Sequence, residues 1–200
     1  MTNTQRKGPL AGVRIVEFAG IGPAPFCGML LADMGADVLL VERPIPPDIG
    51  IPRERRHEIA HRGKASLILD LKQDHARVTA LELAKHADVV IEGFRPGTME
   101  KLGLGPQMCL DANERLIYGR VTGYGQEGPM VQRAGHDLNY IALSGVLHAI
   151  GRVEQAPTPP LNLIGDYAGG AMSLAIGILA ALLERSRTGR GQVVDPKNRS

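Results

Sequence analysis

The chain has 200 residues, which is enough for one domain with a sizeable buried core. Hydrophobic residues make up 44% of the sequence and charged residues 22%, an ordinary balance for a globular protein in water. The formal net charge is only +2, so overall charge gives no argument for binding nucleic acid or a membrane. The two cysteines, Cys27 and Cys109, fit neither a disulfide framework nor a metal-ligand spacing and favour a reducing compartment.

Strand and helix patterns alternate along the chain. Strands are predicted for six apolar, β-branched runs: 13–18, 37–41, 66–71, 88–93, 116–123 and 191–195. Helical periodicity is found between them at 25–34, 74–86 and 166–187. Residues 44–64, rich in Pro and Arg, predict a long functional loop or lid. We expect an α/β fold, a Rossmann-like, mainly parallel sheet with flanking helices, because helical crossovers make neighbouring strands parallel.

Residues 19–42 resemble a dinucleotide-binding unit only in outline. The turn reads G-I-G-P-A-P, so Pro23 and Pro25 stand where a pyrophosphate would need backbone N–H groups. Glu42 is followed by Arg43 and Pro44, which suggests a cationic strand end rather than a ribose-binding one. We therefore interpret this segment as scaffold and not as a nicotinamide-cofactor site.

Basic residues gather in the irregular segment and at two strand ends. Arg43 and Arg95 each follow a predicted strand directly, so we expect them at the carboxyl edge of the sheet, where α/β folds bind ligands. Guanidinium groups at that edge suit a polyphosphate ligand. Simple solvation explains the charges at 53–57 equally well. No aromatic residues interleave with these charges, which disfavours single-stranded nucleic acid.

Two titratable residues stand at predicted helix starts. His136 follows Gly135 in RAGHDLNYIALSG, and Asp166 lies in PPLNLIGDYAGGAM, where the longest helix should begin. Asp166 has a structural explanation as an N-cap that accepts backbone N–H bonds, and His136 has one as a surface residue. Two such residues from separate element starts could also flank one ligand atom. Spacing alone leaves both interpretations open.

A series of ordered motifs resembles the family III CoA-transferase superfamily. In chain order they are FAGIGPAPF, VERP, DLK, IEGFRPGTMEKLGL, RLIYGRVTGYGQEGP, AGHDLNYIALSGVL, PPLNLIGDYAGG and TGRGQVVD. The resemblance runs over residues 10–195. Within the superfamily the chain is most similar to the α-methylacyl-CoA racemase group. This finer resemblance rests mainly on AGHDLNY, since transferases usually carry an aromatic residue where His136 stands.

The resemblance implies roles for individual residues. His136 and Asp166 would be the two bases on opposite sides of C2 of a 2-methylacyl-CoA, with inversion through an enolate and no metal or redox cofactor. Backbone N–H groups at the helix start of His136 and Asp137 are expected to face the enolate oxygen. Asn139 and Tyr140 would orient neighbours or line the thioester pocket, although packing explains Tyr140 equally well. In the transferases, the residue matching Asp166 is instead a nucleophile that forms an acyl anhydride.

The resemblance also implies a CoA site and a partner subunit. The basic residues expected to bind the CoA phosphates are Arg43, Arg62, Lys64, Arg95 and Lys101. Family members form interlocked homodimers and continue into a smaller second domain, whose Glu pairs with the catalytic His. We therefore expect an incomplete CoA-binding large domain over residues 1–195, then a polar tail outside the family pattern over 196–200. A CoA-binding fragment without activity is the third possible function.

The sequence shows neither a secretion signal nor a long apolar run. The opening residues, MTNTQRKGPLAG, contain no apolar segment of the kind found in a secretion signal. The longest apolar run, 171–183, is shorter than the roughly 20 residues that a membrane-spanning helix needs. We expect a cytoplasmic protein with an acyl-CoA substrate and neither a membrane nor a nucleic-acid partner.

Overall fold

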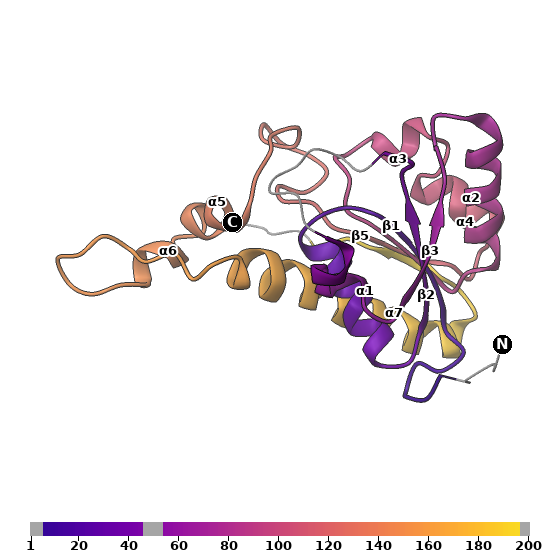
Figure 1. Ribbon diagram of the computed structural model, residues 1–200, viewed down its shortest axis with the longest axis horizontal. Helices are drawn as coiled ribbons and strands as arrows, with labels where there is room; N and C mark the ends of the chain where they lie inside the picture. The colour runs from indigo at the N-terminus through magenta and orange to yellow at the C-terminus, as the bar shows by residue number, and fades with distance from the viewer. Residues whose placement is uncertain (1–5, 46–53, 197–200) are drawn as a thin grey trace.

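Six parallel strands form the centre of the molecule (Figure 1). The computed structural model describes residues 6–45 and 54–196. Across the sheet the order is β3-β2-β1-β4-β5-β6, and each neighbouring pair is parallel. The strands span β1 Arg14–Phe18, β2 Asp37–Glu42, β3 Lys64–Ile68, β4 Val89–Glu92, β5 Ile117–Arg120 and β6 Gln192–Val194. This is the doubly wound order, which confirms the predicted Rossmann-like α/β fold and places a ligand crevice at the carboxyl ends of β1 and β4.

Helices cover both faces of the sheet (Figure 1). On one face, α1 (Pro23–Asp33) and α7 (Ser173–Thr188) bury apolar side chains such as Leu31 and Ile178. On the other face lie α2 (Asp74–His86), α3 (Thr98–Lys101) and α4 (Pro106–Ala112). The strands between these layers are apolar on both sides, as a parallel sheet covered on two faces requires. The remaining short helices are η1 (Arg55–His57), η2 (Ile59–His61), α5 (Asp137–Leu143), α6 (Val146–Ala149) and η3 (Leu163–Met172).

Several predicted boundaries differ from the structure by one to three residues, among them those of the fifth strand, predicted at 116–123 and found at Ile117–Arg120. The third strand begins at Lys64 rather than at residue 66 and ends at Ile68, because Asp70 starts a turn in which its carbonyl accepts the Gln73 N–H. The longest helix begins earlier than predicted, with the π-helical segment η3, so Asn162 and not Asp166 occupies the N-cap position. Asp166 therefore lies in the first turn, where its side chain is free for another role. Most of the predicted loop 44–64 lies outside the described residues or in η1 and η2.

The π-helical segment η3 and the helix α7 run together as one helical stretch, Leu163–Thr188. By length and composition alone this stretch is apolar enough to cross a membrane, with a mean hydropathy of 1.6. The core helix of a water-soluble protein passes the same test. In this fold Leu174 and Ile178 of the stretch are fully buried against the sheet. The apolar run 171–183 is therefore only part of this stretch, which was predicted to be helical over 166–187.

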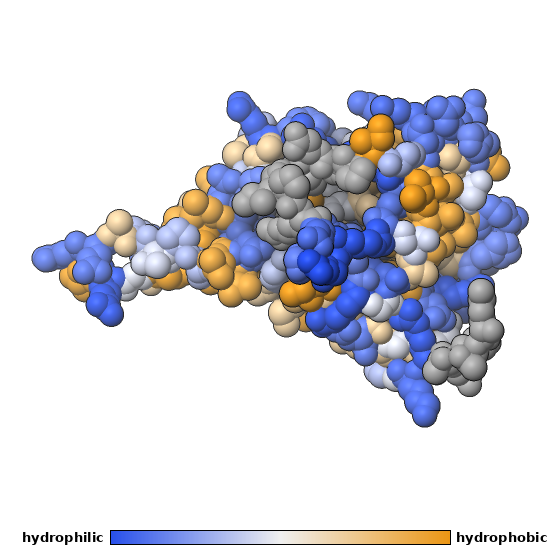
Figure 2. Space-filling view, viewed as in Figure 1, coloured by the Kyte–Doolittle hydropathy of each residue, from blue (hydrophilic) through white to orange (hydrophobic). Residues whose placement is uncertain are grey.

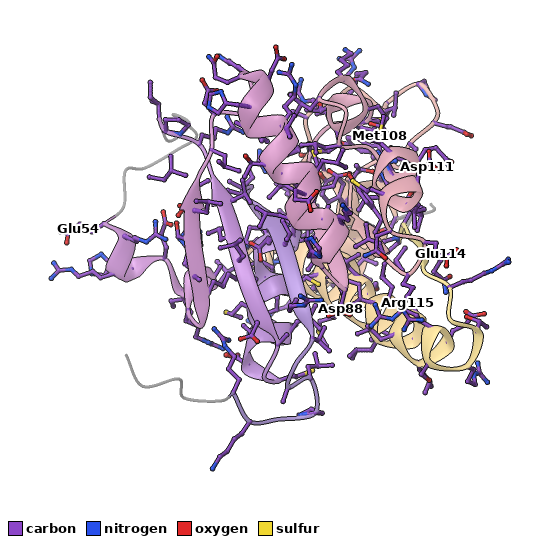
Figure 3. The ribbon with its side chains drawn as sticks, turned by 90° about the vertical axis from the view of Figure 1, so that its right-hand side faces the viewer. Glu54, Asp88, Met108, Asp111, Glu114 and Arg115 are labelled. Carbon is purple, nitrogen blue, oxygen red and sulfur yellow. The ribbon has the colours of Figure 1, made fainter. Side chains whose placement is uncertain are left out.

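An ion-pair network fixes α7 to the sheet. Arg185 of α7 lies 3.0 Å from the Asp88 carboxylate and donates to the backbone carbonyls of Asp88 and Arg115. Asp88 and Arg115 lie just ahead of β4 and β5, where Figure 3 labels both side chains beside α7. This anchor sets the position of α7 and therefore of η3, which leads into it.

The segment that contains α5 and α6, which we call the arm, projects away from the sheet and the helices that cover it (Figure 1). Several of its large apolar side chains are exposed, among them Leu138, Leu143, Val153, Leu161 and Leu163. In Figure 2 apolar surface gathers on the arm close to the body of the molecule. The arm carries His136 at its base, so it belongs to the architecture of the candidate site.

Candidate active site

The centre of the site is a contact between the first turns of α5 and η3. Asp137, the first residue of α5, is 3% exposed, and its Oδ2 accepts the backbone N–H of Asp166 at 2.8 Å. Gly165 makes this approach possible, since a Cβ there would lie 3.1 to 3.2 Å from the backbone and side chain of Asp137. The Asp137 carboxylate thus holds the backbone of Asp166, a role that the sequence analysis did not predict for it.

The start of α1 forms the opposite wall of the site. Gly22, directly before α1, has a φ of 71°, and a Cβ on it would lie 3.7 Å from Oδ2 of Asp166. Phe26 of α1 stacks on Tyr167 of η3, with ring centroids 4.3 Å apart and planes inclined by 11°. Asp166 is therefore enclosed between two helix starts and is only 9% exposed. The segment around Gly22 was interpreted from sequence as scaffold, and the contact of Gly22 with Asp166 was not predicted.

The surroundings of Asp166 make its carboxyl group a weaker acid than usual. Burial raises its pKa most, and the negative charge of Asp137 raises it further. A positive charge on His136 acts in the opposite direction, which shows that the two predicted bases lie within electrostatic reach of each other. His136 itself is exposed at the N-cap of α5. A carboxyl group whose pKa is raised toward neutrality is suited to giving and taking a proton.

Asn139 caps the helix that begins after His136. Its Oδ1 accepts the backbone N–H of His136 at 2.9 Å. This bond gives Asn139 one of its two expected roles, that of orienting a neighbour, and it corrects one expectation, since the His136 N–H is occupied and does not face an enolate. The N–H of Asp137, the other donor of that pair, is directed at the Asp166 carboxylate and lowers the pKa of that group.

Tyr140 packs behind the site in a slot shared with Tyr124. The two rings meet edge to face, with centroids 5.3 Å apart and planes inclined by 76°. Burial raises the pKa of Tyr140 to about 12, and the charge of Asp166 adds to this effect. Gly123 and Gly135 leave room for the rings, since a Cβ on either would press on the Tyr140 ring. Tyr140 therefore stays a neutral hydroxyl beside Asp166, and both packing and substrate contact fit its position.

Gly135→Ala is expected to destabilise this tyrosine slot. The added Cβ would lie 2.7 Å from the Tyr124 hydroxyl and 2.7 Å from Cε1 of Tyr140, so both rings must shift. Overpacking of this kind costs roughly 1–3 kcal/mol in the free energy of unfolding, which urea denaturation measures. Gly20→Ala is the matched control, because a Cβ at that position meets no atom within 4 Å. Equal stability of the two variants would contradict the steric argument.

The five predicted CoA-phosphate ligands divide into three groups. Arg43, Arg95 and Lys101 are exposed near the carboxyl ends of β2 and β4, at the ligand-binding edge of the sheet. Arg62 is exposed but bonded to the Asp33 carboxylate, at 3.1 Å through Nε and 2.5 Å through a terminal nitrogen. Lys64 is buried, which takes its ammonium group away from any ligand.

Lys64 forms an ion pair beneath α1. Its Nζ lies 2.7 and 2.6 Å from the two carboxylate oxygens of Glu17 and 2.9 Å from the carbonyl oxygen of Pro25. All three ammonium hydrogens therefore have acceptors, and the side chain is only 1% exposed. This placement does not agree with the expected role of Lys64 in binding a CoA phosphate, because no ammonium hydrogen is left for a phosphate.

A second charged cluster at the sheet edge was missed in the sequence. Arg120 at the end of β5 lies 3.4 Å from Glu92 at the end of β4 and 3.0 Å from Glu100 of α3. Glu92 also accepts the backbone N–H of Phe94 at 2.7 Å. Burial raises the pKa of Glu92 to about 7. The cluster fixes the turn after β4 that presents Arg95, and acidic residues ending apolar strands were the signal for it.

Comparison with known proteins identifies the family of the chain. Residues 10–197 match the family model described as CoA-transferase family III. The chain belongs to CoA-transferase family III, which confirms the resemblance drawn from the motifs.

Three relatives in the family, two racemases and one transferase subunit, are similar to the chain in sequence. The chain is 49% identical to the α-methylacyl-CoA racemase of Homo sapiens over 188 residues and 50% identical to that of Mus musculus over 186 residues. Each alignment covers 93% of this chain and 47% of the relative. It is also 41% identical to the succinyl-CoA–L-malate CoA-transferase β subunit of Chloroflexus aurantiacus, over 98% of this chain and 50% of the relative. The chain thus spans about half the length of these relatives.

Solved structures confirm the fold. A CaiB/BaiF family protein from Brucella suis superposes with a TM-score of 0.85 at 34% identity, covering 96% of this chain and 54% of that one. The Mycobacterium tuberculosis protein Rv3272 superposes with a TM-score of 0.84 at 40% identity, covering 96% of this chain and 55% of that one.

Proposed function

We propose that this chain carries both bases of a racemase that inverts C2 of 2-methylacyl-CoA thioesters. The observation that supports this most is the pairing of an exposed His136 with a buried Asp166 whose pKa is raised. The racemase relatives, at 49 and 50% identity, support the same assignment. The activity, its substrate and the roles of His136 and Asp166 are all part of what we propose.

Each turnover would move one proton off C2 and one proton back. One base takes the α-proton, and the electron pair left on C2 spreads into the thioester carbonyl to give an enolate. The other base, already protonated, returns a proton to the opposite face of C2. Burial and the nearby Asp137 charge raise the pKa of Asp166, which favours a carboxyl group that can give as well as take a proton.

The enolate oxygen needs hydrogen-bond donors. The backbone N–H of His136 is bonded to Asn139 and that of Asp137 to the Asp166 carboxylate, so we assign Asp137 N–H to the enolate oxygen with the condition that its bond to Asp166 opens when substrate binds. The Asp137 side chain contributes differently, by holding the Asp166 backbone. No metal or redox cofactor enters this sequence of steps.

The CoA moiety and the assembly are further parts of the proposal. Arg43, Arg95 and Lys101 are exposed at the sheet edge and suit the CoA phosphates, and Arg62 would join them by exchanging Asp33 for a phosphate. The exposed apolar side chains of the arm fit a homodimer interface. The free, buried cysteines Cys27 and Cys109 fit a reducing cytoplasm.

A CoA-transferase is the second candidate. It is favoured by the 41% identity with the Chloroflexus transferase subunit. In that case Asp166 would attack the thioester carbonyl and form an acyl anhydride, releasing CoA as the thiolate. The exposed His136 beside Asp166 favours proton transfer over this chemistry.

Incubation with a 2-methylacyl-CoA in D₂O tests the proposal. A racemase incorporates deuterium at C2 and interconverts the R and S thioesters, which NMR and chiral chromatography measure. Hydroxylamine is added in parallel with succinyl-CoA, because it traps an acyl anhydride on Asp166 as a hydroxamate. Deuterium without a hydroxamate supports the racemase, whereas a hydroxamate without deuterium supports the transferase. CoA binding with neither product would show a fragment that binds without catalysing.

A further inference from the structure

A buried ion pair lies beneath α1, outside the residues that the proposed reaction uses. Glu17 is on β1 and Lys64 begins β3, so the pair bridges two strands that are separated by β2. Their side chains are 0% and 1% exposed. Burial raises the pKa of the Glu17 carboxyl and lowers that of the Lys64 ammonium, while each charge opposes the effect on its partner. The pair is therefore held by mutual attraction against the cost of removing both groups from water.

Stability of the sheet alone does not explain this pair. Two apolar side chains of similar volume in such a place are often as stabilising as a buried ion pair, or more so. What an apolar pair cannot provide is a directed bond to a third element. Lys64 makes such a bond, to the Pro25 carbonyl in the first turn of α1, at 2.9 Å.

The helix α1 rests directly on this pair. A Cβ on Gly28 would collide with the Glu17 carboxylate and would lie 3.1 Å from the Lys64 Nζ. The α1 backbone is thus in van der Waals contact with the pair on one side and bonded to it at Pro25. Both the height and the register of α1 above the sheet are set at this point.

The first turn of α1 is also the wall of the candidate site. Gly22, three residues before Pro25, faces the Asp166 carboxylate, at 3.7 Å from the position of a Cβ. Pro23 packs against Gly170 of η3, where a Cβ would lie 3.0 Å away. A displacement of α1 would therefore change how closely Asp166 is enclosed.

We propose that Glu17 and Lys64 act as a positioning pair that holds the first turn of α1 against Asp166. The pair does not touch the substrate and acts through Gly22. This inference rests on the proposed function, because it assigns importance to the placement of Asp166 as a base. The alternative is a pair that only stabilises the fold.

The test is the double variant Glu17→Leu/Lys64→Met, which removes both charges and keeps apolar volume. The control is Glu82→Leu/Lys85→Met, which makes the same replacements at an exposed ion pair on α2, on the other face of the sheet. Three properties are measured in each: thermal unfolding, the ¹³Cγ NMR titration of Asp166, and amide hydrogen exchange in residues 22–26. The last two do not depend on catalysis.

In the double variant we expect a folded protein in which water reaches Asp166 more freely. The Asp166 titration should then move down toward the ordinary aspartate pKa, and the amides at 22–26 should exchange faster. Deuterium incorporation at C2 should fall roughly 10- to 100-fold in kcat with little change in KM, as expected when a base is misplaced by a fraction of an ångström. The control should match the parent in all three.

A folded double variant with unchanged Asp166 titration and unchanged amide exchange would overturn the proposal. If the double variant does not fold, Glu17→Asp decides instead, since it keeps both charges but shortens the carboxylate arm. Movement of the Asp166 titration in Glu17→Asp supports positioning, and its absence overturns it. A parent protein without deuterium exchange refutes the proposed function alone, because the titration still shows whether the pair positions Asp166.

Discussion

His136→Ala and Asp166→Ala are each expected to abolish interconversion of the R and S thioesters. Inversion at C2 needs a base on one face and an acid on the other, and each variant lacks one of them. General acid–base groups contribute roughly 10²- to 10⁴-fold each, so the inversion rate should fall by about that factor. Chiral chromatography of the thioester after incubation measures it.

Deuterium exchange separates the two bases. Each variant should still exchange the α-proton of the single enantiomer that presents it to the remaining base, without inverting it. The retained enantiomer should differ between the two variants, because the bases stand on opposite faces. His148→Ala and Asp111→Ala are controls that remove one His and one Asp at exposed positions on α6 and α4, outside the site. Full inversion activity in His136→Ala would contradict the two-base mechanism, because Asp166 alone would then have to serve both faces of C2.

The order of the elements could be predicted from sequence because it depends on local patterns. Apolar, β-branched runs such as 37–41 and 88–93 appear in the sheet within one residue of their predicted bounds. The predicted positions of His136 and Asp166 at element starts also agree with the structure, although Asp166 sits in a first turn rather than at a cap. These features depend on residues close together in the chain.

The role of Lys64 depends on a partner that is distant in sequence, whereas the role of Asn139 depends on a residue close to it in the chain. Lys64 stands in a basic segment and was assigned to phosphate, but its partner Glu17 is 47 residues earlier and two strands away. A charged residue inside the apolar run 13–18 was the available sign of a buried partner. The Asn139 cap is local, and an Asn three residues after His136 at a helix start pointed to it.

The contact between Gly22 and Asp166 shows the limit of motif-based reasoning. The segment around Gly22 resembles a phosphate-binding turn in outline, because its glycines follow a strand. In the structure the positive φ of Gly22 instead lets the α1 start approach a carboxylate that is 144 residues later, and no local pattern encodes that approach. The fold brings the two together through the parallel sheet, because α1 and η3 cover the same face.

Lys64→Met is expected to lower the free energy of unfolding by about 3–5 kcal/mol near neutral pH. The variant leaves the Glu17 carboxylate buried without its cation, and breaking a buried pair from one side costs about this much. Urea denaturation measures the change. In the double variant Glu17→Leu/Lys64→Met most of the loss should be recovered, since no uncompensated charge is left. A double variant as unstable as the single one would show that lost packing, and not the unpaired charge, causes the effect.

The loss in Lys64→Met should also depend on pH. Burial raises the pKa of Glu17 above its ordinary value and the charge of Lys64 lowers it, so removal of the lysine raises this pKa further. A carboxyl group with a raised pKa in the folded state stabilises fully below the unfolded pKa, near 4.5, and this stability is lost as pH rises through the folded pKa. The variant should therefore be closest to the parent near pH 4.5 and furthest from it above pH 7. The double variant lacks Glu17, so its stability should not follow this pH profile. If Lys64→Met loses as much stability at pH 4.5 as at pH 8, Glu17 does not take up the proton.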